Sequence, residues 1–556
     1  MADDSQPGSG TAHPFPALPL SENADCYRQG LASVMTLDGP AAAGRRLTPR
    51  RAGLLASVMV LAAGLWALGV APGGVYYDDG IYLILGRALA QGEGLRYLNL
   101  PGLPAATHYP PGYPAVLALC WRIGGDLPAA LALAKGLNVL FLAGAAGLLA
   151  ACLAKAGAEP IVAALGVAAG AIATPVLSVT TVAFSEPLFL FTLALAAWAT
   201  TEATRKGGLA RAALAGAAWG GLFLVRSIGI VAMPVGMTLL LRQRRWQPVT
   251  VSGAAALAVI APWIVWSSAH AHEVPNILAG SYGSYLGWYL GALEREGPML
   301  AGRIVIHNLR ELVRPLAVLL GPPVVPTLGG ILIPSGAVLL GLGGRRLARL
   351  APFFAGFLAT YLLIVVAWPY PPDRFIWGLW PLVTVTLAFG LQEVAAVAMH
   401  PGRLRIASAV LLGCGVLSGL GYLAREGTGL GRKSWQASQA ASAAAMGPAV
   451  EWVRAHVPDS AVVATVNDPL LYLYSGRRAV PMLSWSAEEH VTAQTVPVAT
   501  RNLADILTAY RPAYVILPGG GTPEAFAAEQ LWKEEQRLEL IDTLAGGGAV
   551  FAPSAP

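Results

Sequence analysis

Charged residues are scarce in this 556-residue sequence. Asp, Glu, Lys and Arg make up 12% of it, whereas apolar residues make up 55%. Soluble domains carry about 25% charged residues, so the composition excludes a water-soluble globular protein. Apolar stretches of about 18 residues or more, long enough to cross a hydrocarbon core of ~30 Å, recur along the chain. The sequence therefore predicts an α-helical polytopic membrane protein.

Several other common signals are missing. The four cysteines, Cys26, Cys120, Cys152 and Cys414, have no metal-ligand spacing, and we expect no disulfide framework. We find no internal repeat, and the net charge of +6 resides mostly in short loops, so it does not indicate nucleic-acid binding. Residues 1–44 are polar and lack the two regions of a signal peptide; we expect a disordered cytoplasmic tail.

The apolar runs predict about eleven spans within residues 45–425. A twelfth stretch, 113–123, is too short to cross the membrane and is interpreted as a half-helix or interfacial helix. The predicted spans are 52–70, 128–152, 159–178, 185–203, 209–225, 228–241, 249–268, 323–342, 350–369, 375–397 and 404–422.

Basic residues fall in alternate loops between these runs, for example Arg50 and Arg51 before the first run and Arg345 with Arg346 later. Cytoplasmic loops are enriched in Lys and Arg, so the pattern places the N-terminus in the cytoplasm and the C-terminus outside. The outer side then carries the first loop, 71–127, a second large loop, 269–322, and the tail. Candidate functional residues gather on that side.

Two adjacent carboxylates, Asp78 and Asp79, directly follow the first span. They precede a segment, 81–89, whose apolar residues have helical spacing, which predicts an amphipathic helix at the membrane interface. One Asp could simply cap this helix. Capping needs only one carboxylate, however, and two adjacent acids can raise one pKa, as suits a general base.

Further polar residues stand at predicted span mouths. Glu186 in "SEPLFL" is either a functional acid or a helix-start glutamate, and the two readings are equally weighted. The prolines of "THYPPGYP" present His108, Tyr109 and Tyr113 at a fixed place. Arg374 in "PYPPDR" could bind lipid headgroups or receive a leaving phosphate.

Two other outer segments carry charged residues. In "HAHE", His270, His272 and Glu273 form only a weak metal-ligand pattern. The stretch 299–316 predicts an amphipathic helix that lies on anionic headgroups or contacts the substrate. Its basic face contains Arg303, His307, Arg310 and Arg314, opposite Leu300, Ile304, Leu309 and Leu312.

The segments "YYDDGIYLILGRALAQGEG", "HYPPGYPAVLAL", "SEPLFL" and "DRFIWGLWPLV" together resemble bacterial GT-C glycosyltransferases. The resemblance covers about residues 50–425 and is closest to protein O-mannosyltransferases, aminoarabinose transferases of lipid A and related core-sugar transferases. It implies a GT-C-like membrane domain in a bacterial inner membrane. It also implies an enzyme that moves a sugar from a polyprenyl-phosphate donor to a hydroxyl acceptor on the outer face.

The resemblance also implies roles for individual residues. Asp78 takes the place of the aspartate in the family's Asp-Glu pair and would be the general base of an inverting transfer, whereas Asp79 stands one methylene shorter than the usual Glu. Glu186 matches an acid at a later span mouth, and Asp79 or Glu186 would orient the acceptor or the sugar as a further catalytic residue. His108, where some relatives have lysine, and Arg374 would lie near the donor phosphate. Tyr109, Tyr113, Arg303 and Arg310 are candidate substrate contacts, and no cofactor or metal is implied.

Apolar runs cease near residue 430, and strand and helix patterns alternate in 430–556. Segments 461–466 and 513–518 read as strands, 470–476 as helix or strand, and 523–537 as a helix, while Pro458 ends a preceding helix. The tail therefore predicts a small extracytoplasmic α/β domain.

Other functions stay open at this point. A transporter or flippase would carry acids in mid-span and repeated halves, whereas the acids here stand at span mouths. A glycan ligase or polymerase of the cell envelope would differ mainly in its acceptor, which could be lipid A, core glycan, another envelope glycan or a protein. A non-catalytic scaffold with an outer sensory domain would tolerate loss of Asp78.

Overall fold

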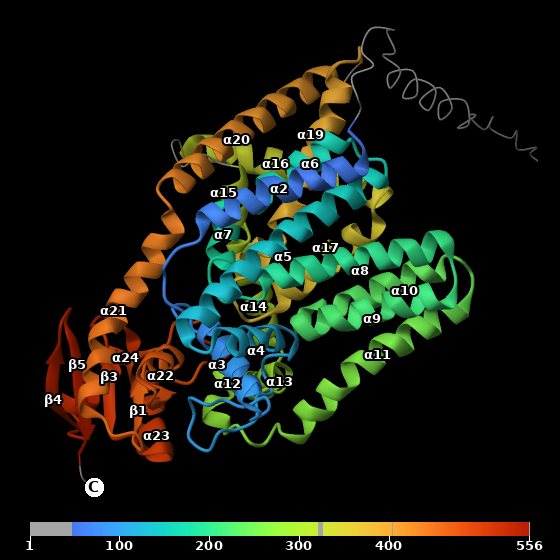
Figure 1. Ribbon diagram of the computed structural model, residues 1–556. Coiled ribbons are helices and arrows are strands. Elements are labelled where there is room, and N and C mark those ends of the chain that lie inside the picture. Colours follow the sequence, from blue (N-terminus) through green and yellow to red (C-terminus); the bar gives the residue numbers. More distant parts are fainter. Residues whose placement is uncertain (1–46, 321–325, 403, 555–556) are drawn as a thin grey trace, which may run out of the picture. The chain divides into compact units, whose positions relative to one another are not determined.

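The computed structural model describes residues 47–320, 326–402 and 404–554. The predicted tail, 1–44, lies outside these residues. From Thr48 onward the chain forms one compact unit, in which a helical bundle is followed by a small sheet near the C-terminal end (Figure 1).

Each apolar run predicted to span the membrane corresponds to a helix or to two consecutive helices. Most of the polar segments between these runs are short, so the helices pack mainly on one another. These helices are α2 (Pro49–Ala67), α5 (Leu127–Lys155), α6 (Pro160–Ala171) with α7 (Thr174–Thr180), α8 (Glu186–Lys206), α9 (Leu209–Val225), η1 (Ser227–Val231) with α10 (Ala232–Leu241), α11 (Trp246–Ala269), α16 (Pro326–Leu350), α17 (Pro352–Ala367), α19 (Trp380–Ala398) and α20 (Arg405–Gly431).

Six of the described helices are long and apolar enough to cross a membrane, and a seventh crossing results if α6 and α7 are one span bent by 63°. Helices α9 and α17, and the η1–α10 pair, are apolar but shorter. The structure thus describes a multi-pass membrane protein, while the number of eleven crossings stays a prediction.

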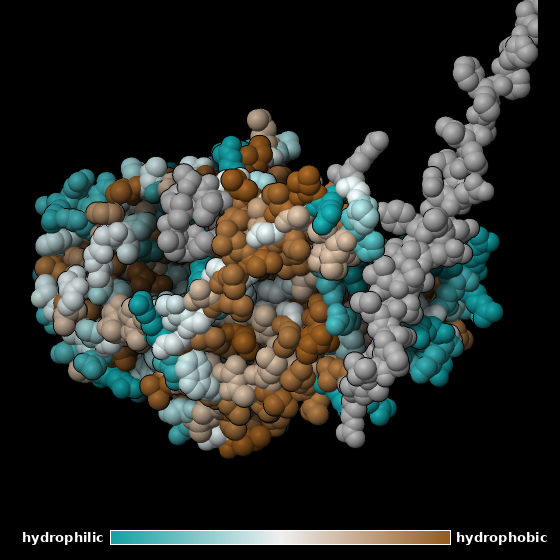
Figure 2. All heavy atoms as spheres, turned by 90° about the horizontal axis from the view of Figure 1, so that it is seen from above, coloured by the Kyte–Doolittle hydropathy of each residue, from teal (hydrophilic) through white to brown (hydrophobic). Residues whose placement is uncertain are grey.

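Large apolar side chains remain exposed on this bundle, among them Leu54 and Val58 of α2 and Val410 and Leu420 of α20. Figure 2 shows hydrophobic residues spread across the middle of one face, between two more hydrophilic ends. Such a surface is stable against lipid tails rather than water.

The first outer loop contains two short helices, α3 (Asp78–Gln91) and α4 (Gly112–Gly124). Helix α4 covers the stretch that was too short to span. Helix α3 is more buried than an interfacial helix, because Ile81, Leu83, Ile84 and Leu85 are all inaccessible. Its start is therefore held by protein contacts.

The second outer loop contains η2 (Asn276–Leu278), α12 (Ala279–Tyr282), α13 (Tyr285–Glu296), α14 (Met299–Glu311) and α15 (Val313–Leu320). Leu300 and Ile304 of α14 are buried as predicted, but Leu309 is exposed and does not belong to that face. Asn308 takes its place in the buried row and donates to carbonyls of α17 and the residues after it. The short helix α18 (Pro372–Trp377) precedes α19.

The C-terminal part begins with α21 (Ser434–His456) and contains a five-stranded sheet of order β2-β1-β3-β5-β4. Strands β2, β1 and β3 are parallel, and β5 is antiparallel to both β3 and β4. Its remaining elements are β1 (Val462–Thr465), α22 (Asp468–Ser475), β2 (Arg478–Pro481), α23 (Val496–Tyr510), β3 (Tyr514–Leu517), α24 (Pro523–Lys533), β4 (Leu538–Leu544) and β5 (Gly548–Pro553).

The sheet and the outer loops share one hydrophobic core. Val75 and Phe184, which adjoin the candidate acids, pack in the same cluster as Val463 of β1, Leu470 of α22 and Ile516 of β3. The C-terminal part therefore contacts the segments in which the candidate site residues lie.

Candidate functional site

The candidate site begins at a strained turn. Tyr77 has φ 67° and ψ −69°, and the Asp78 N–H donates to the Tyr76 carbonyl over 2.8 Å. These values describe a γ-turn with positive φ, a rare and strained conformation. Strained residues persist only where their surroundings enforce them, often at functional sites. Asp78 is the last residue of this turn and the first residue of α3.

The two adjacent carboxylates have different environments. Asp79 is fully buried, and its oxygens accept hydrogen bonds from the backbone N–H groups of Gly74 (2.7 Å) and Tyr76 (2.9 Å). It does not line the cavity into which Asp78 opens. Burial raises the pKa of Asp79 to about 6, although the two hydrogen bonds oppose the rise. Asp79 therefore holds the turn, which explains why two acids occur in sequence.

We expect Asp79→Asn to lower the free energy of unfolding by about 1–3 kcal/mol, because an amide leaves one backbone N–H unpaired. The folded protein binds the Asp79 proton more tightly than the unfolded chain does. The stability that this tighter proton binding adds is fully present below the ordinary pKa of 3.8. It is lost as the pH rises through about 6, the pKa of Asp79 in the folded protein. Thermal unfolding in detergent across this range tests both effects; a variant that keeps the wild-type pH dependence would contradict them.

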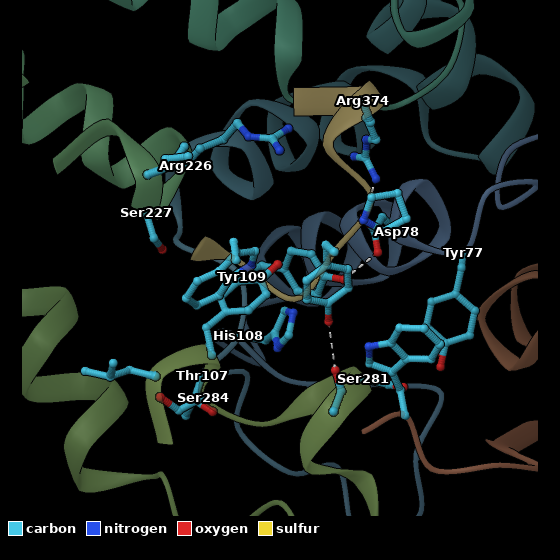
Figure 3. Close-up of a pocket in the computed structure, with 18 of the residues that line it drawn as sticks. Tyr77, Asp78, Thr107, His108, Tyr109, Arg226, Ser227, Ser281, Ser284 and Arg374 are labelled. Carbon is cyan, nitrogen blue, oxygen red and sulfur yellow. Dashed lines mark hydrogen bonds and ion pairs between the residues drawn. The ribbon is translucent and has the colours of Figure 1, made fainter. Parts of the chain in front are cut away.

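Asp78 is partly accessible and paired. Its carboxylate accepts from the Tyr109 hydroxyl over 2.7 Å and from Arg374 Nη1 over 2.5 Å, and its side chain is 31% exposed. Figure 3 shows Asp78 and Arg374 directed toward each other within the cavity. The arginine forms an ion pair with the carboxylate, and the tyrosine restricts its orientation.

Glu186 lies behind two arginines. It is 3% exposed, and its Oε1 accepts from Arg374 Nε (2.7 Å) and pairs with Arg226 Nη1 (2.6 Å). Ser185 and Pro187 begin α8 here, as expected for a helix start. Glu186 therefore starts a helix and also pairs with two arginines, while its role as a functional acid stays a prediction. It does not line the cavity itself.

Aromatic rings support the two arginines. The Arg374 guanidinium lies 3.7 Å from the centre of the Phe184 ring, and that of Arg226 lies 5.6 Å from the Phe375 ring. Although burial lowers the pKa of Arg374, Glu186 and Asp78 raise it well above the ordinary value. Both arginines line the cavity, where they can bind an anion.

Sequence reasoning missed Arg226. The signal was a single arginine in "FLVRSIGIV", between two apolar runs. A charged residue at membrane depth is costly and is a functional candidate by default.

The cavity has a volume of about 1090 Å³ and two chemically different sides. Asp78, Arg226 and Arg374 line this same cavity. The apolar side comes from α9, η1, α11 and α17 and includes Phe223, Ile228, Ile230, Trp263, Ile264 and Ile364. The other side comes from the C-terminal part and includes the polar residues Ser484, Glu489, Gln494 and Glu524 beside apolar ones such as Met482, Leu483 and Trp485.

His108 reaches the cavity but not as the predicted cation. Its Nδ1 lies 2.6 Å from the Gly283 carbonyl, which can only accept, so Nδ1 carries the proton. Burial lowers the pKa of His108 to about 4, which leaves Nε2 unprotonated at neutral pH. The centre of the buried ring lies 3.5 Å from that of Tyr285, with the ring planes tilted by 43°. The neutral ring can accept a hydrogen bond but cannot form an ion pair with a phosphate.

Of the other predicted substrate contacts, one lines the cavity and three do not. Tyr109 lines the cavity and binds Asp78. Tyr113 is inaccessible and donates to Asn138 over 3.2 Å, so it packs behind the site rather than in it. Arg303 and Arg310 do not line the cavity; Arg303 lies 4.0 Å from Glu296 instead.

The "HAHE" segment is used for local structure. Glu273 Oε2 accepts from the Ala105 N–H over 2.9 Å and lies 3.5 Å from Arg96 Nη1. His270 Nδ1 binds the Trp266 carbonyl. Within the described part of the chain, no group of three or more His, Cys, Asp and Glu side chains is arranged to hold a metal ion.

No protein-family model matches this chain, and no curated protein matches it either. Solved structures do. The chain is similar to ArnT from Cupriavidus metallidurans in the apo state, with a TM-score of 0.52 and 15% identity over 90% of this chain and 97% of that one. For ArnT bound to undecaprenyl phosphate, the TM-score is 0.50 and the identity 14%, with the same coverage. Arabinosyltransferase EmbB from Mycobacterium smegmatis aligns with a TM-score of 0.39 and 13% identity, over 91% of this chain and 45% of that one. The likeness to ArnT shows that this chain has the GT-C-like fold predicted from its motifs.

Proposed function

We propose that the chain is a membrane glycosyltransferase that moves a sugar from a polyprenyl-phosphate donor to a hydroxyl acceptor. The observation that carries the proposal is the meeting of Asp78 with Arg226 and Arg374 in one cavity that is apolar on one side. A lipid-linked sugar needs all three features: an apolar path for its chain, cations for its phosphate and a base for the incoming hydroxyl. The similar ArnT structure with bound undecaprenyl phosphate supports this donor class.

In the proposed reaction, the acceptor oxygen attacks the anomeric carbon in line and with inversion. The new carbon–oxygen bond forms as the bond between the anomeric carbon and the phosphate oxygen breaks. The Asp78 carboxylate takes the hydroxyl proton. Arg226 and Arg374 stabilise the negative charge that grows on the departing polyprenyl phosphate. Glu186 keeps both guanidinium groups in place and does not touch the substrate.

The two sides of the cavity suggest where each substrate lies. We place the donor's lipid along the apolar side and the acceptor along the side formed by the C-terminal part, near Ser484 and Trp485. Glu524 on that side would repel a phosphate group on the acceptor, whereas burial raises the pKa of the neighbouring lining residue Glu489 to about 7. We further place the cavity on the extracytoplasmic face of the bacterial inner membrane, as the loop charges predict.

A transfer assay tests the proposal. Membranes from cells that lack the gene would supply donor lipid and unmodified acceptor, and purified full-length protein would be added. We expect mass spectrometry to detect one acceptor class that gains the mass of a single sugar, in step with the appearance of free polyprenyl phosphate. Unchanged glycans together with a lipid that changes membrane leaflet would indicate a flippase instead.

A further inference from the structure

Helix α22 and its cap, Asn467, hold the backbone that leads to Asp78. Asn467 Nδ2 donates to the Gly74 carbonyl over 2.9 Å. The Tyr474 hydroxyl accepts from the Gly73 N–H, also over 2.9 Å. These side chains are about 400 residues away in sequence and contact the segment 73–77, here called the Asp78 loop.

Packing against α22 is close enough to require glycine at two positions. A Cβ on Gly80 would lie 2.8 Å from Pro469 Cβ, and one on Gly74 would lie 3.1 Å from Leu470 Cα. Gly74 also has φ +87°, which disfavours a side chain there. The distance between α22 and the start of α3 is thus set by direct backbone contact.

Asp468 extends the contact to the second outer loop. It is fully buried and accepts from Asn99 Nδ2 over 2.8 Å and from the Tyr282 hydroxyl. The Tyr282 ring centre lies 6.3 Å from that of Tyr77, the strained residue of the γ-turn. The γ-turn is therefore held in two ways: Asn467 and α22 bind the backbone that precedes it, and Tyr282 packs near the Tyr77 side chain.

We infer that Asn467 and α22 position Asp78 for proton transfer, so that the C-terminal part belongs to the catalytic machinery of the membrane domain. The inference rests on the proposed role of Asp78 as the base. The strained γ-turn relaxes unless neighbouring groups enforce it. A displacement of about 1 Å in a reacting group can cost about 10²-fold in rate. Asn467 acts through the Asp78 loop and is a positioning residue.

The test uses substitutions that spare the helix cap. Asn467 Oδ1 also accepts from the Leu470 N–H over 3.1 Å, and serine or aspartate can cap α22 in the same way. The aspartate carboxylate has no proton to donate to the Gly74 carbonyl, and the shorter serine side chain places its hydroxyl farther from that carbonyl than the asparagine amide. Asn467→Ser and Asn467→Asp should therefore lower the maximal transfer rate about 10- to 100-fold, while the Kd for undecaprenyl phosphate stays at the wild-type value. Tyr474→Phe removes the second contact and should act in the same direction.

Asp542→Ala is the matched control, since it removes a hydrogen bond of 2.8 Å to Trp452 elsewhere in the same C-terminal part. It should keep the wild-type rate even if it lowers the melting temperature as much as the Asn467 variants do. Wild-type rates in Asn467→Ser and Tyr474→Phe, with Asp78→Asn inactive, would overturn the positioning role alone. An equal loss of lipid binding and rate would overturn it as well. Full activity of Asp78→Asn would instead remove the proposed base.

Discussion

Asp78→Asn should lower the rate of sugar transfer about 10³-fold, the scale of a lost general base, while the protein still folds and binds undecaprenyl phosphate. The substitution preserves the shape of the side chain, and its amide oxygen can still accept from the Tyr109 hydroxyl. It removes the basic oxygen that would take the acceptor's proton. The rate is measured in the membrane transfer assay, and lipid binding is measured by native mass spectrometry.

Asp126→Asn is a suitable control for this substitution. Asp126 caps α5 through the Ala129 N–H, outside the cavity, and asparagine caps a helix equally well. We expect wild-type transfer from it. If Asp78→Asn transfers sugar as fast as Asp126→Asn does, Asp78 is not the base.

Replacing either cavity arginine by glutamine should weaken binding of undecaprenyl phosphate about 10- to 100-fold, because a hydrogen bond to a charged group contributes about 1.5–3 kcal/mol. Arg374→Gln should also lower thermal stability more than Arg226→Gln does. Among the described residues, Arg374 forms ion pairs with Asp78 and Glu186, whereas Arg226 forms one with Glu186. Binding is measured by titration of the purified protein with the lipid.

Arg303→Gln controls for the general loss of positive charge near headgroups. Arg303 lies outside the cavity, and its side chain is 45% exposed. Undecaprenyl phosphate should bind this variant with wild-type affinity. Equal losses in all three variants would mean that the lipid responds to surface charge and not to a specific phosphate site.

Much of the fold was predictable because apolar periodicity reports directly on membrane helices. The apolar runs that form α5 and α11 are long and apolar enough to predict membrane-spanning helices directly. The C-terminal helix α21 was less predictable, since Pro448 lies inside it and normally marks a helix start or break. The order of the sheet depends on pairing between distant strands, which single-sequence patterns do not encode.

The site was predictable in part. Asp78 and Arg374 came from motifs, and the structure joins them by an ion pair across 296 positions. The difference between Asp78 and Asp79 was not predictable, because it depends on which carboxylate faces the Gly74 and Tyr76 N–H groups. The neutral state of His108 likewise depends on burial and on a carbonyl in a distant loop.

The central claim is that Asp78, Arg226 and Arg374 form one site for a lipid-linked phosphosugar. A cryo-electron microscopy structure of the full chain with undecaprenyl phosphate tests it most directly. We predict that the phosphate lies within hydrogen-bond distance of Arg226 and Arg374, with the lipid along Phe223 and Trp263. A phosphate bound elsewhere, for example beside Arg87 and Arg122 in the pocket between α3 and α4, would contradict the account.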